Sequence, residues 1–119
     1  MKIDHIVISV KNLKLSKKFY SAFLGKATIG KEDVSWKLGG TKLFIASPYK
    51  KNALKFNKAN LGLNHFAFRA STKKELASYQ LKLDKAKIAN SGVQIDKYSK
   101  KEFIWFDDPD GIRLEFYLR

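Results

Sequence analysis

The chain has 119 residues, of which 45% are hydrophobic and 13% aromatic, and its formal net charge is +13. This length and composition are typical of one folded domain with a core, and they exclude a disordered protein. There is no cysteine, which excludes disulfides, thiolate metal sites and a cysteine nucleophile. No apolar run approaches the roughly 20 residues of a membrane-spanning helix. The start, MKIDHIVISVKNLK, lacks the apolar core of a signal peptide, so we expect a cytoplasmic protein.

The positive charge is spread along the chain. Lysines occur from Lys2 to Lys101, and they far outnumber the three arginines. Arginine, not lysine, is the usual bidentate reader of phosphates and bases. A solvated, lysine-rich surface therefore explains the charge, and the sequence predicts no nucleic-acid or membrane partner. An anionic small molecule stays open as a ligand.

The first half of the chain predicts a strand, a helix and three further strands. The segment IDHIVISV at 3–10 alternates as a strand does. Asn12 is a good helix cap, and Gly25 is a typical helix end. The expected apolar face of this helix consists of Leu15, Phe19 and Phe23. The strands that follow are expected at about 26–31, 34–38 and 41–47.

The second half repeats this pattern after a polar, lysine- and asparagine-rich linker at about 49–62. The segment LNHFAFRA at 63–70 resembles the first strand. Thr72 and Glu75 form a T-x-x-E capping box at the start of a helix that ends before Gly92. The expected apolar face of this second helix consists of Leu76, Tyr79 and Leu83. The strands that follow are expected at about 93–98, 102–107 and 112–118, the last two joined by the turn DPDG at 108–111.

The repeat defines the fold class. Two βαβββ modules, at about 1–48 and 63–119, make one α+β domain that spans residues 1–119. We expect each module to form a curved sheet with its helix on the convex face, and the two modules to pair.

Strand alternation places three polar residues together. His5 and His65, the only two histidines, occupy equivalent positions of the repeat and should lie on the faces opposite the helices. Glu115, in the apolar run of the last strand, should share that face. Two imidazoles and one carboxylate make a 2-His-1-carboxylate metal site. The alternative is that both histidines are satisfied core residues and that Glu115 pairs with Arg69 or Arg113. The joint occurrence of the three residues favours the metal site.

The sequence resembles the vicinal oxygen chelate superfamily, which includes glyoxalases, extradiol dioxygenases and fosfomycin- and bleomycin-resistance proteins. The matching stretches are HIVISVKNLKLSKKFYSAFLG at 5–25, LNHFAF at 63–68 and WFDDPDGIRLEF at 105–116. The resemblance implies a divalent metal (Fe, Mn, Zn or Ni) held by His5, His65 and Glu115, and a small substrate that chelates it through two neighbouring oxygens. It also implies a homodimer.

We assign further roles on the faces that carry these ligands. Arg69 and Arg113 are expected to orient an anionic substrate, Phe44 to line the pocket, and Tyr117, with Glu115, to act in catalysis. Metal-dependent glyoxalases carry a fourth ligand on the fourth strand, but TKLFIAS at 41–47 has no carboxylate and places Phe44 opposite Glu115 in the repeat. The favoured function is therefore a metal-dependent lyase, dioxygenase or transferase of this superfamily. The alternative is a non-catalytic module that binds a small ligand.

Overall fold

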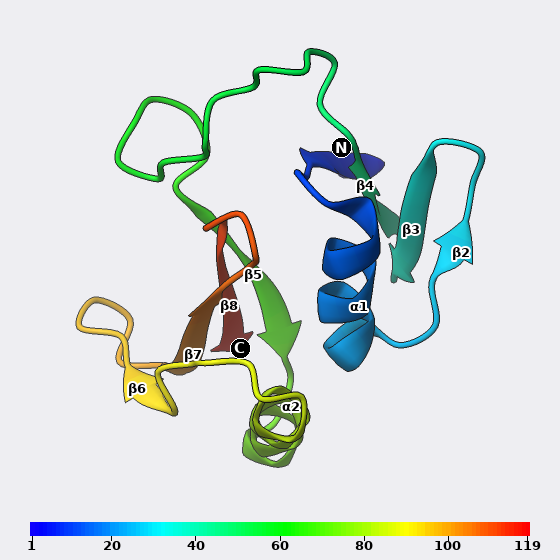
Figure 1. Ribbon diagram of the computed structural model, residues 1–119. Coiled ribbons are helices and arrows are strands. Elements are labelled where there is room, and N and C mark those ends of the chain that lie inside the picture. Colours follow the sequence, from blue (N-terminus) through cyan, green and yellow to red (C-terminus); the bar gives the residue numbers. More distant parts are fainter. The chain divides into compact units, whose positions relative to one another are not determined.

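A computed structural model describes all 119 residues as two units, Met1–Lys55 and Phe56–Arg119 (Figure 1). Each unit contains one helix and one four-stranded sheet. The α+β fold class and the two βαβββ modules are thereby confirmed. Neither helix combines the length and apolar composition that a membrane-spanning helix needs.

Unit 1 has the strand order β1-β4-β3-β2. Strand β1 pairs in parallel with β4, and the other pairs are antiparallel. The elements are β1 (His5–Ser9), α1 (Leu13–Leu24), β2 (Thr28–Ile29), β3 (Asp33–Leu38) and β4 (Thr41–Ala46). The buried core of this unit consists of Ile8, Val10, Tyr20, Phe23, Val34, Trp36, Leu43 and Ile45.

The ends of α1 are the expected ones, but its buried face is not. The Asn12 side chain accepts a hydrogen bond from the Leu15 backbone at 3.0 Å, and Gly25 follows the helix with a φ of 86°. The buried helix residues are Ser16, Tyr20 and Phe23, whereas Leu15 is 51% exposed. Leu15, which was predicted on the apolar face, therefore lies outside the buried face, and Tyr20, which was not predicted there, lies over Trp36 with ring centroids 5.7 Å apart.

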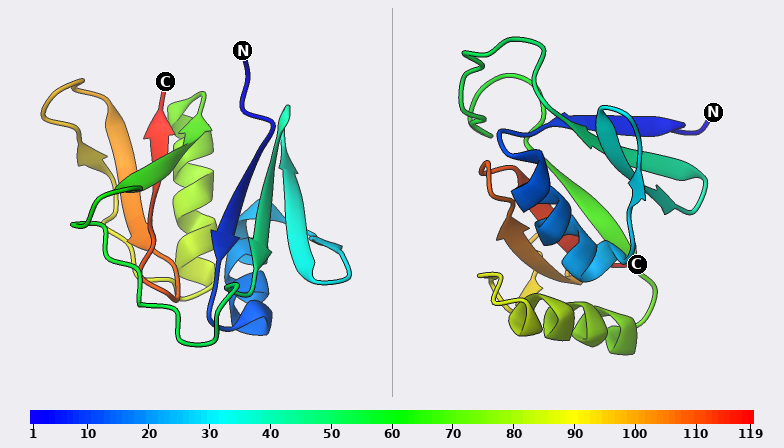
Figure 2. Two further views of the ribbon diagram at one scale, coloured as in Figure 1. Left: turned by 90° about the horizontal axis from the view of Figure 1, so that it is seen from above. Right: turned by 45° about the vertical axis from the view of Figure 1, so that its right-hand side comes forward.

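Unit 2 repeats the topology, with the strand order β5-β8-β7-β6 and a parallel β5–β8 pair. Its elements are β5 (His65–Ala70), α2 (Lys73–Lys85), β6 (Gln94–Ile95), β7 (Glu102–Asp107) and β8 (Arg113–Leu118). Helix α2 packs against one face of this sheet (Figure 2). Tyr79 of α2 lies over Phe116 of β8, with ring centroids 4.7 Å apart. The even-numbered residues of β8 thus face the helix, as alternation predicted.

The capping box of α2 is shifted by one residue from the usual pattern. The Thr72 hydroxyl accepts from the Glu75 backbone at 3.1 Å, but the Glu75 carboxylate accepts from the Ser71 backbone at 3.0 Å. The other Glu75 oxygen accepts from the Tyr79 hydroxyl. Burial and this carboxylate raise the pKa of Tyr79 to about 12.

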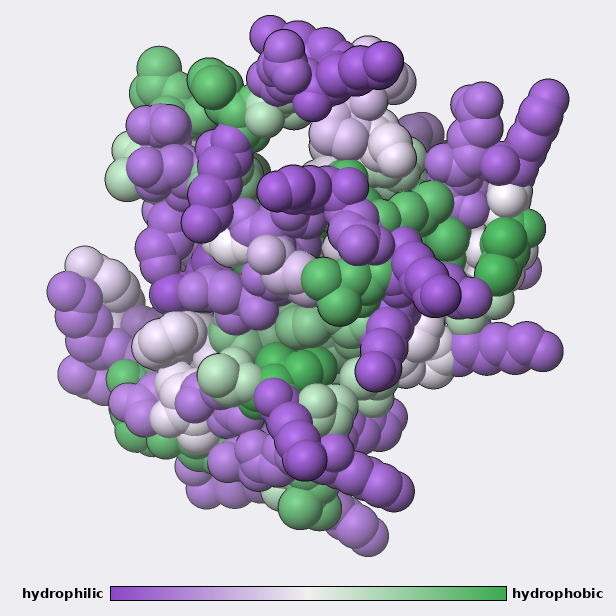
Figure 3. Space-filling view, in the orientation of Figure 1, coloured by the Kyte–Doolittle hydropathy of each residue, from purple (hydrophilic) through white to green (hydrophobic).

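Strands β2 and β6 are shorter than expected because turns end them early. The Gly30 backbone donates to the Asp33 carbonyl at 2.9 Å, which closes a turn directly after β2. The Asp96 backbone donates to the Lys101 carbonyl at 2.8 Å, which does the same after β6. The face of the molecule shown in Figure 3 is largely hydrophilic, with hydrophobic groups between the hydrophilic ones.

Candidate functional site

The face of the unit 2 sheet opposite α2 carries most of the candidate residues; we call it the Glu115 face. Strand register places three residues of β5, β8 and β7 side by side in each of three rows across this face. The rows are His65–Arg113–Asp107, Ala67–Glu115–Trp105 and Arg69–Tyr117–Phe103. Glu115 is therefore at the centre, with charged or aromatic side chains around it and one small residue, Ala67, beside it.

His65 leans across the sheet towards Glu115. Its Nε2 lies 3.6 Å from Glu115 Oε2, and its Nδ1 donates to the Asn64 side-chain oxygen at 2.7 Å. The Asn64 amide nitrogen in turn donates to the Lys58 carbonyl at 3.2 Å, which fixes the orientation of the amide. The Asn64 contact occupies Nδ1 and leaves Nε2 on the side of the carboxylate, where a metal-ligating histidine would need it.

Glu115 is largely covered, with 13% of its side chain exposed. Burial raises the pKa of this carboxyl above its usual value, and the nearby charges of His65 and Arg113 oppose the increase. The charged form is thus disfavoured by desolvation and needs compensation from cations. A divalent metal ion at His65 would supply that compensation.

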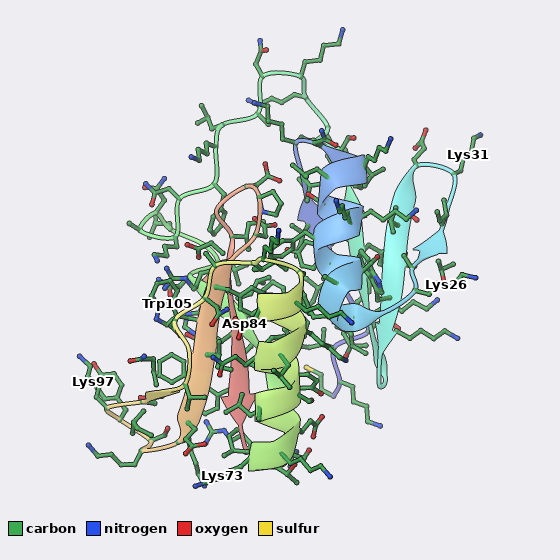
Figure 4. All side chains as sticks on the ribbon, turned by 60° about the horizontal axis from the view of Figure 1, so that its bottom comes forward. Lys26, Lys31, Lys73, Asp84, Lys97 and Trp105 are labelled. Atoms are coloured by element: carbon green, nitrogen blue, oxygen red, sulfur yellow. The ribbon has the colours of Figure 1, made fainter.

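Arg113 is already occupied by protein partners. Its Nε donates to Asp107 Oδ1 at 2.6 Å, and its guanidinium lies 4.0 Å from the centre of the Trp105 ring. Trp105 is 37% exposed and lies on the side of β7 away from α2 (Figure 4). The alternative in which Glu115 pairs with Arg69 or Arg113 is not what is seen, since its ion-pair partner is His65.

Tyr117, the candidate proton donor, is held at the end of the Glu115 face. Its hydroxyl donates to Asp96 Oδ2 at 2.5 Å and also contacts the Ser99 hydroxyl. Asp96 also accepts from the Tyr98 backbone, so the turn between β6 and β7 is tied to β8. These hydrogen bonds lower the pKa of Asp96, the one from Tyr117 most strongly.

In unit 1, the corresponding histidine is also hydrogen-bonded through Nδ1 to the side chain of the residue before it. His5 Nδ1 donates to Asp4 Oδ2 at 2.7 Å, so its Nε2 is also the free ring nitrogen. Phe44 lies edge-on to His5, with ring centroids 5.9 Å apart, and is half-buried. Val7, opposite Phe44 in the β1–β4 register, is 56% exposed.

The structure thus brings five predicted site residues onto one face of unit 2, and two onto unit 1. His65, Glu115, Tyr117, Arg69 and Arg113 share the Glu115 face, whereas His5 and Phe44 are neighbours in unit 1. Within unit 2 the metal-ligand types near Glu115 make a pair, not a group of three. The complete three-ligand set, which needs His5, stays a prediction.

Sequence reasoning missed four polar residues that hold the candidates in place. They are Asp4, Asn64, Asp96 and Asp107. The first two had a readable signal, since each directly precedes the histidine of its repeat and has a side-chain oxygen. Asp96 and Asp107 had no such signal in the sequence, because strand pairing determines which residues lie next to them.

The family model "Glyoxalase/Bleomycin resistance protein/Dioxygenase superfamily" matches residues 2–116. The chain belongs to this superfamily. It is 28% identical over 125 residues to the uncharacterized protein YaeR of Escherichia coli K12, covering 97% of this chain and 94% of that protein. It is 27% identical over 122 residues to a trivalent organoarsenical cleaving enzyme of Bacillus sp. MD1, covering 98% and 73%.

Solved structures show the same fold. A candidate glyoxalase from Bacillus halodurans matches with a TM-score of 0.81 at 22% identity, covering 98% of this chain and 95% of that one. A lactoylglutathione lyase from Agrobacterium tumefaciens gives 0.75 at 18% identity, covering 98% and 92%. The fosfomycin resistance protein FosX from Listeria monocytogenes gives 0.74 at 16% identity, covering 100% and 93%. At these identities the likeness concerns the fold.

Proposed function

We propose that this protein is a divalent-metal-dependent enzyme of the superfamily, with His5, His65 and Glu115 as the metal ligands. The observation that carries the proposal is the approach of His65 Nε2 to Glu115 Oε2, at 3.6 Å. Its substrate is a small molecule that offers two neighbouring oxygens and an anionic group. Membership of the superfamily and the fold relatives support this substrate class.

The His65–Glu115 pair fits a metal ion. Two ligand atoms at about 2.1 Å from one ion, at tetrahedral angles, are about 3.4 Å apart. The observed separation of 3.6 Å needs almost no rearrangement to meet this value. The Nδ1 hydrogen bond to Asn64 also fixes the ring orientation and tautomer that a metal requires.

When bound, the ion would act as a Lewis acid on the chelating oxygens of the substrate. The other roles belong to the protein. Arg69 and Arg113 provide positive charge on the Glu115 face for an anionic group, and Phe44 is the apolar wall beside His5. Tyr117 is the proton donor of the proposal, with Asp96 as the group that orients its hydroxyl. The reaction is a lyase, dioxygenase or transferase reaction.

The absence of cysteine argues against one activity found among the relatives, the cleavage of trivalent organoarsenicals. Soft elements such as trivalent arsenic favour thiolate ligands, and this protein has none to offer. We therefore do not extend organoarsenical cleavage to it. A hard anion such as a carboxylate suits its arginines better.

A non-catalytic binding function is the second candidate, and one observation favours it. Tyr117 and Arg113 already donate to Asp96 and Asp107. Glu115 is the one carboxylate in the central row of the Glu115 face, and a bound metal ion would leave it unable to act as an acid or a base. A protein that holds a ligand at this face without transforming it would need no further acid or base.

Metal content and thermal stability test the proposal. Purified protein is expected to contain a stoichiometric divalent ion, and Mn²⁺, Fe²⁺, Ni²⁺ or Zn²⁺ should raise the melting temperature of the metal-free form. His5→Ala, His65→Ala and Glu115→Gln should each remove this effect. Glu102→Gln is the matched control, since Glu102 lies on β7 and pairs with Lys73 at 3.4 Å. Stabilisation by ligands but by no metal would instead support the binding module.

Assembly and location belong to the same proposal. The resemblance to single-domain members implies a homodimer, and closed twofold dimers are the commonest oligomers. The cytoplasm is the proposed location. Light scattering coupled to gel filtration is expected to give twice the mass of the 13.6 kDa chain. A monomeric mass at micromolar concentration would contradict it.

A further inference from the structure

The positive charge is divided unevenly between the two units. Unit 1 carries twelve lysines and three carboxylates, a net charge of +9. Unit 2 carries twelve cations and eight carboxylates, a net charge of +4. The lysines are spread along the sequence, but the carboxylates that would balance them are concentrated in unit 2. Unit 1 is therefore the part of the chain that attracts an anionic partner more strongly.

The segment that follows β4 combines lysines with exposed apolar side chains; we call residues 48–55, PYKKNALK, the lysine segment. None of its three lysines forms an ion pair within 4.0 Å. Tyr49 is fully exposed and Leu54 is 93% exposed. There is no carboxylate anywhere in residues 34–74. Large apolar side chains among lysines are typical of segments that lie in a membrane interface.

Helix α1 begins at the same end of the unit 1 sheet. The Val10 backbone donates to the Ala46 carbonyl at 2.8 Å, so the chain leaves β1 and β4 side by side (Figures 1 and 2). From β1 it continues into α1, and from β4 into the lysine segment. Lys14 and Lys18 are exposed on α1, and Leu15, next to Lys14, is half exposed. The topology thus places further lysines and an apolar side chain near the lysine segment.

The charges of α1 are unfavourable for the helix itself. Lys14 and Lys18 are four residues apart, a spacing that brings like charges together on a helix surface. The first turn of α1 has no acidic side chain, although it is the positive end of the helix dipole. Helix α2 has the favourable arrangement, with Glu75 in its first turn and Lys82 and Lys85 in its last. An external anionic surface would relieve the repulsion in α1.

Two carboxylates of unit 1, Glu32 and Asp33, also lie at this end of the sheet. Asp33 is the first residue of β3 and pairs in register with Ala46. Its carboxylate lies against Gly30 of its own turn. The helix α1 and the lysine segment together contribute six lysines, so this end of unit 1 stays strongly positive.

The composition favours a lipid surface over other anionic partners. Nucleic-acid readers rely on arginine, which unit 1 lacks, whereas lysine is a compact charge that suits a field of lipid headgroups. The Tyr49 ring and the Leu54 side chain suit the boundary between headgroups and acyl chains. A second copy of the chain is disfavoured, because a twofold interface at this surface would place the same lysines against one another.

We propose that the lysine segment and the exposed side of α1 bind the surface of a membrane that contains anionic lipid, with Tyr49 and Leu54 entering the headgroup region. This surface replaces, for unit 1, the expectation of lysines that are only solvated, and it needs no membrane-spanning helix. The inference does not depend on the proposed metal site.

Co-sedimentation of the full chain with vesicles tests the proposal. Vesicles of phosphatidylcholine with phosphatidylglycerol should bind the protein, and vesicles of phosphatidylcholine alone should not. Because the chain has no cysteine, Leu54→Cys can carry a single environment-sensitive dye. Its fluorescence should rise on the anionic vesicles, whereas the same dye on Ala77→Cys, at an exposed position of α2, should not respond.

Three variants test the two contributions separately. Lys50→Gln combined with Lys51→Gln should weaken binding about twenty-fivefold, because one lysine near an anionic surface contributes about fivefold. Lys100→Gln combined with Lys101→Gln makes the same change of charge in unit 2 and should leave binding nearly unchanged. Leu54→Ser should weaken binding about tenfold without lowering the melting temperature, because Leu54 is exposed in the free protein.

Four outcomes would overturn the inference. Two of them are equal binding to both kinds of vesicle and an equal loss in the Lys100/Lys101 control. Tighter binding to duplex DNA than to anionic vesicles, lost in the Lys50/Lys51 variant, would assign the surface to nucleic acid. A change from dimer to monomer in Leu54→Ser, measured by light scattering, would assign it to a second copy of the chain.

Discussion

Replacing Asn64 by alanine should weaken metal binding without unfolding the protein. The Asn64 oxygen accepts the Nδ1 proton of His65 at 2.7 Å, and its amide nitrogen is anchored on the Lys58 carbonyl at 3.2 Å. Without this acceptor, the His65 ring can take either tautomer and turn away from Glu115. Asn64 is exposed, so the surrounding structure loses no buried contact.

The expected magnitude follows from the role of such partners. Loss of an outer hydrogen bond to a metal-ligating histidine typically weakens metal affinity by about 10–100-fold, which is about 1.4–2.7 kcal/mol. The effect on the free energy of unfolding of the metal-free protein should stay within about 0.5 kcal/mol, as for other surface substitutions. A large loss of affinity with little loss of stability is therefore the signature of the positioning role.

Competition between the protein and a chromophoric chelator for Zn²⁺ measures the affinity, and ¹⁵N shifts of the two histidines report the tautomers. Asn64→Asp keeps the acceptor and should retain most of the affinity. Asn60→Ala, in the linker that precedes Asn64, is the control and should behave as wild type. An Asn64→Ala variant with unchanged affinity and an unchanged His65 tautomer would refute the reasoning.

Three further results are expected. Glu115→Gln should abolish metal binding yet raise the melting temperature of the metal-free protein at pH 7, because burial raises the pKa of this carboxyl and the charged form is penalised; a lower melting temperature would contradict this. The pKa of Tyr79 is raised from 10.0 to about 12, so its contribution to stability is complete below pH 10 and is lost as the pH rises to about 12. Urea unfolding across this range should show a slope that Tyr79→Phe reduces, and identical slopes would argue against it. Leu114 is fully buried, so Leu114→Ala should lower the free energy of unfolding by about 2–5 kcal/mol in the same assay. A loss below about 1 kcal/mol would mean that neighbouring side chains fill the space left by the mutation.

The sequence alone determined the features that depend on residues close together in the chain. Asn12 and Thr72 start their helices as predicted, because a cap needs only a side-chain oxygen three residues before the backbone donor. The alternation of β8 correctly separated Leu114 and Phe116 from Glu115. The stretches at 5–25, 63–68 and 105–116 were sufficient to recognise the superfamily.

The tertiary structure decided which side chains are partners. His65 and Glu115 are 50 positions apart, and their approach follows from the parallel register of β5 and β8. The same holds for Arg113, which pairs with Asp107 across an antiparallel register. Alternation assigns a face to a residue, but it does not assign the neighbour on that face. Register and rotamer fix the neighbour, and both depend on the packing of the whole sheet.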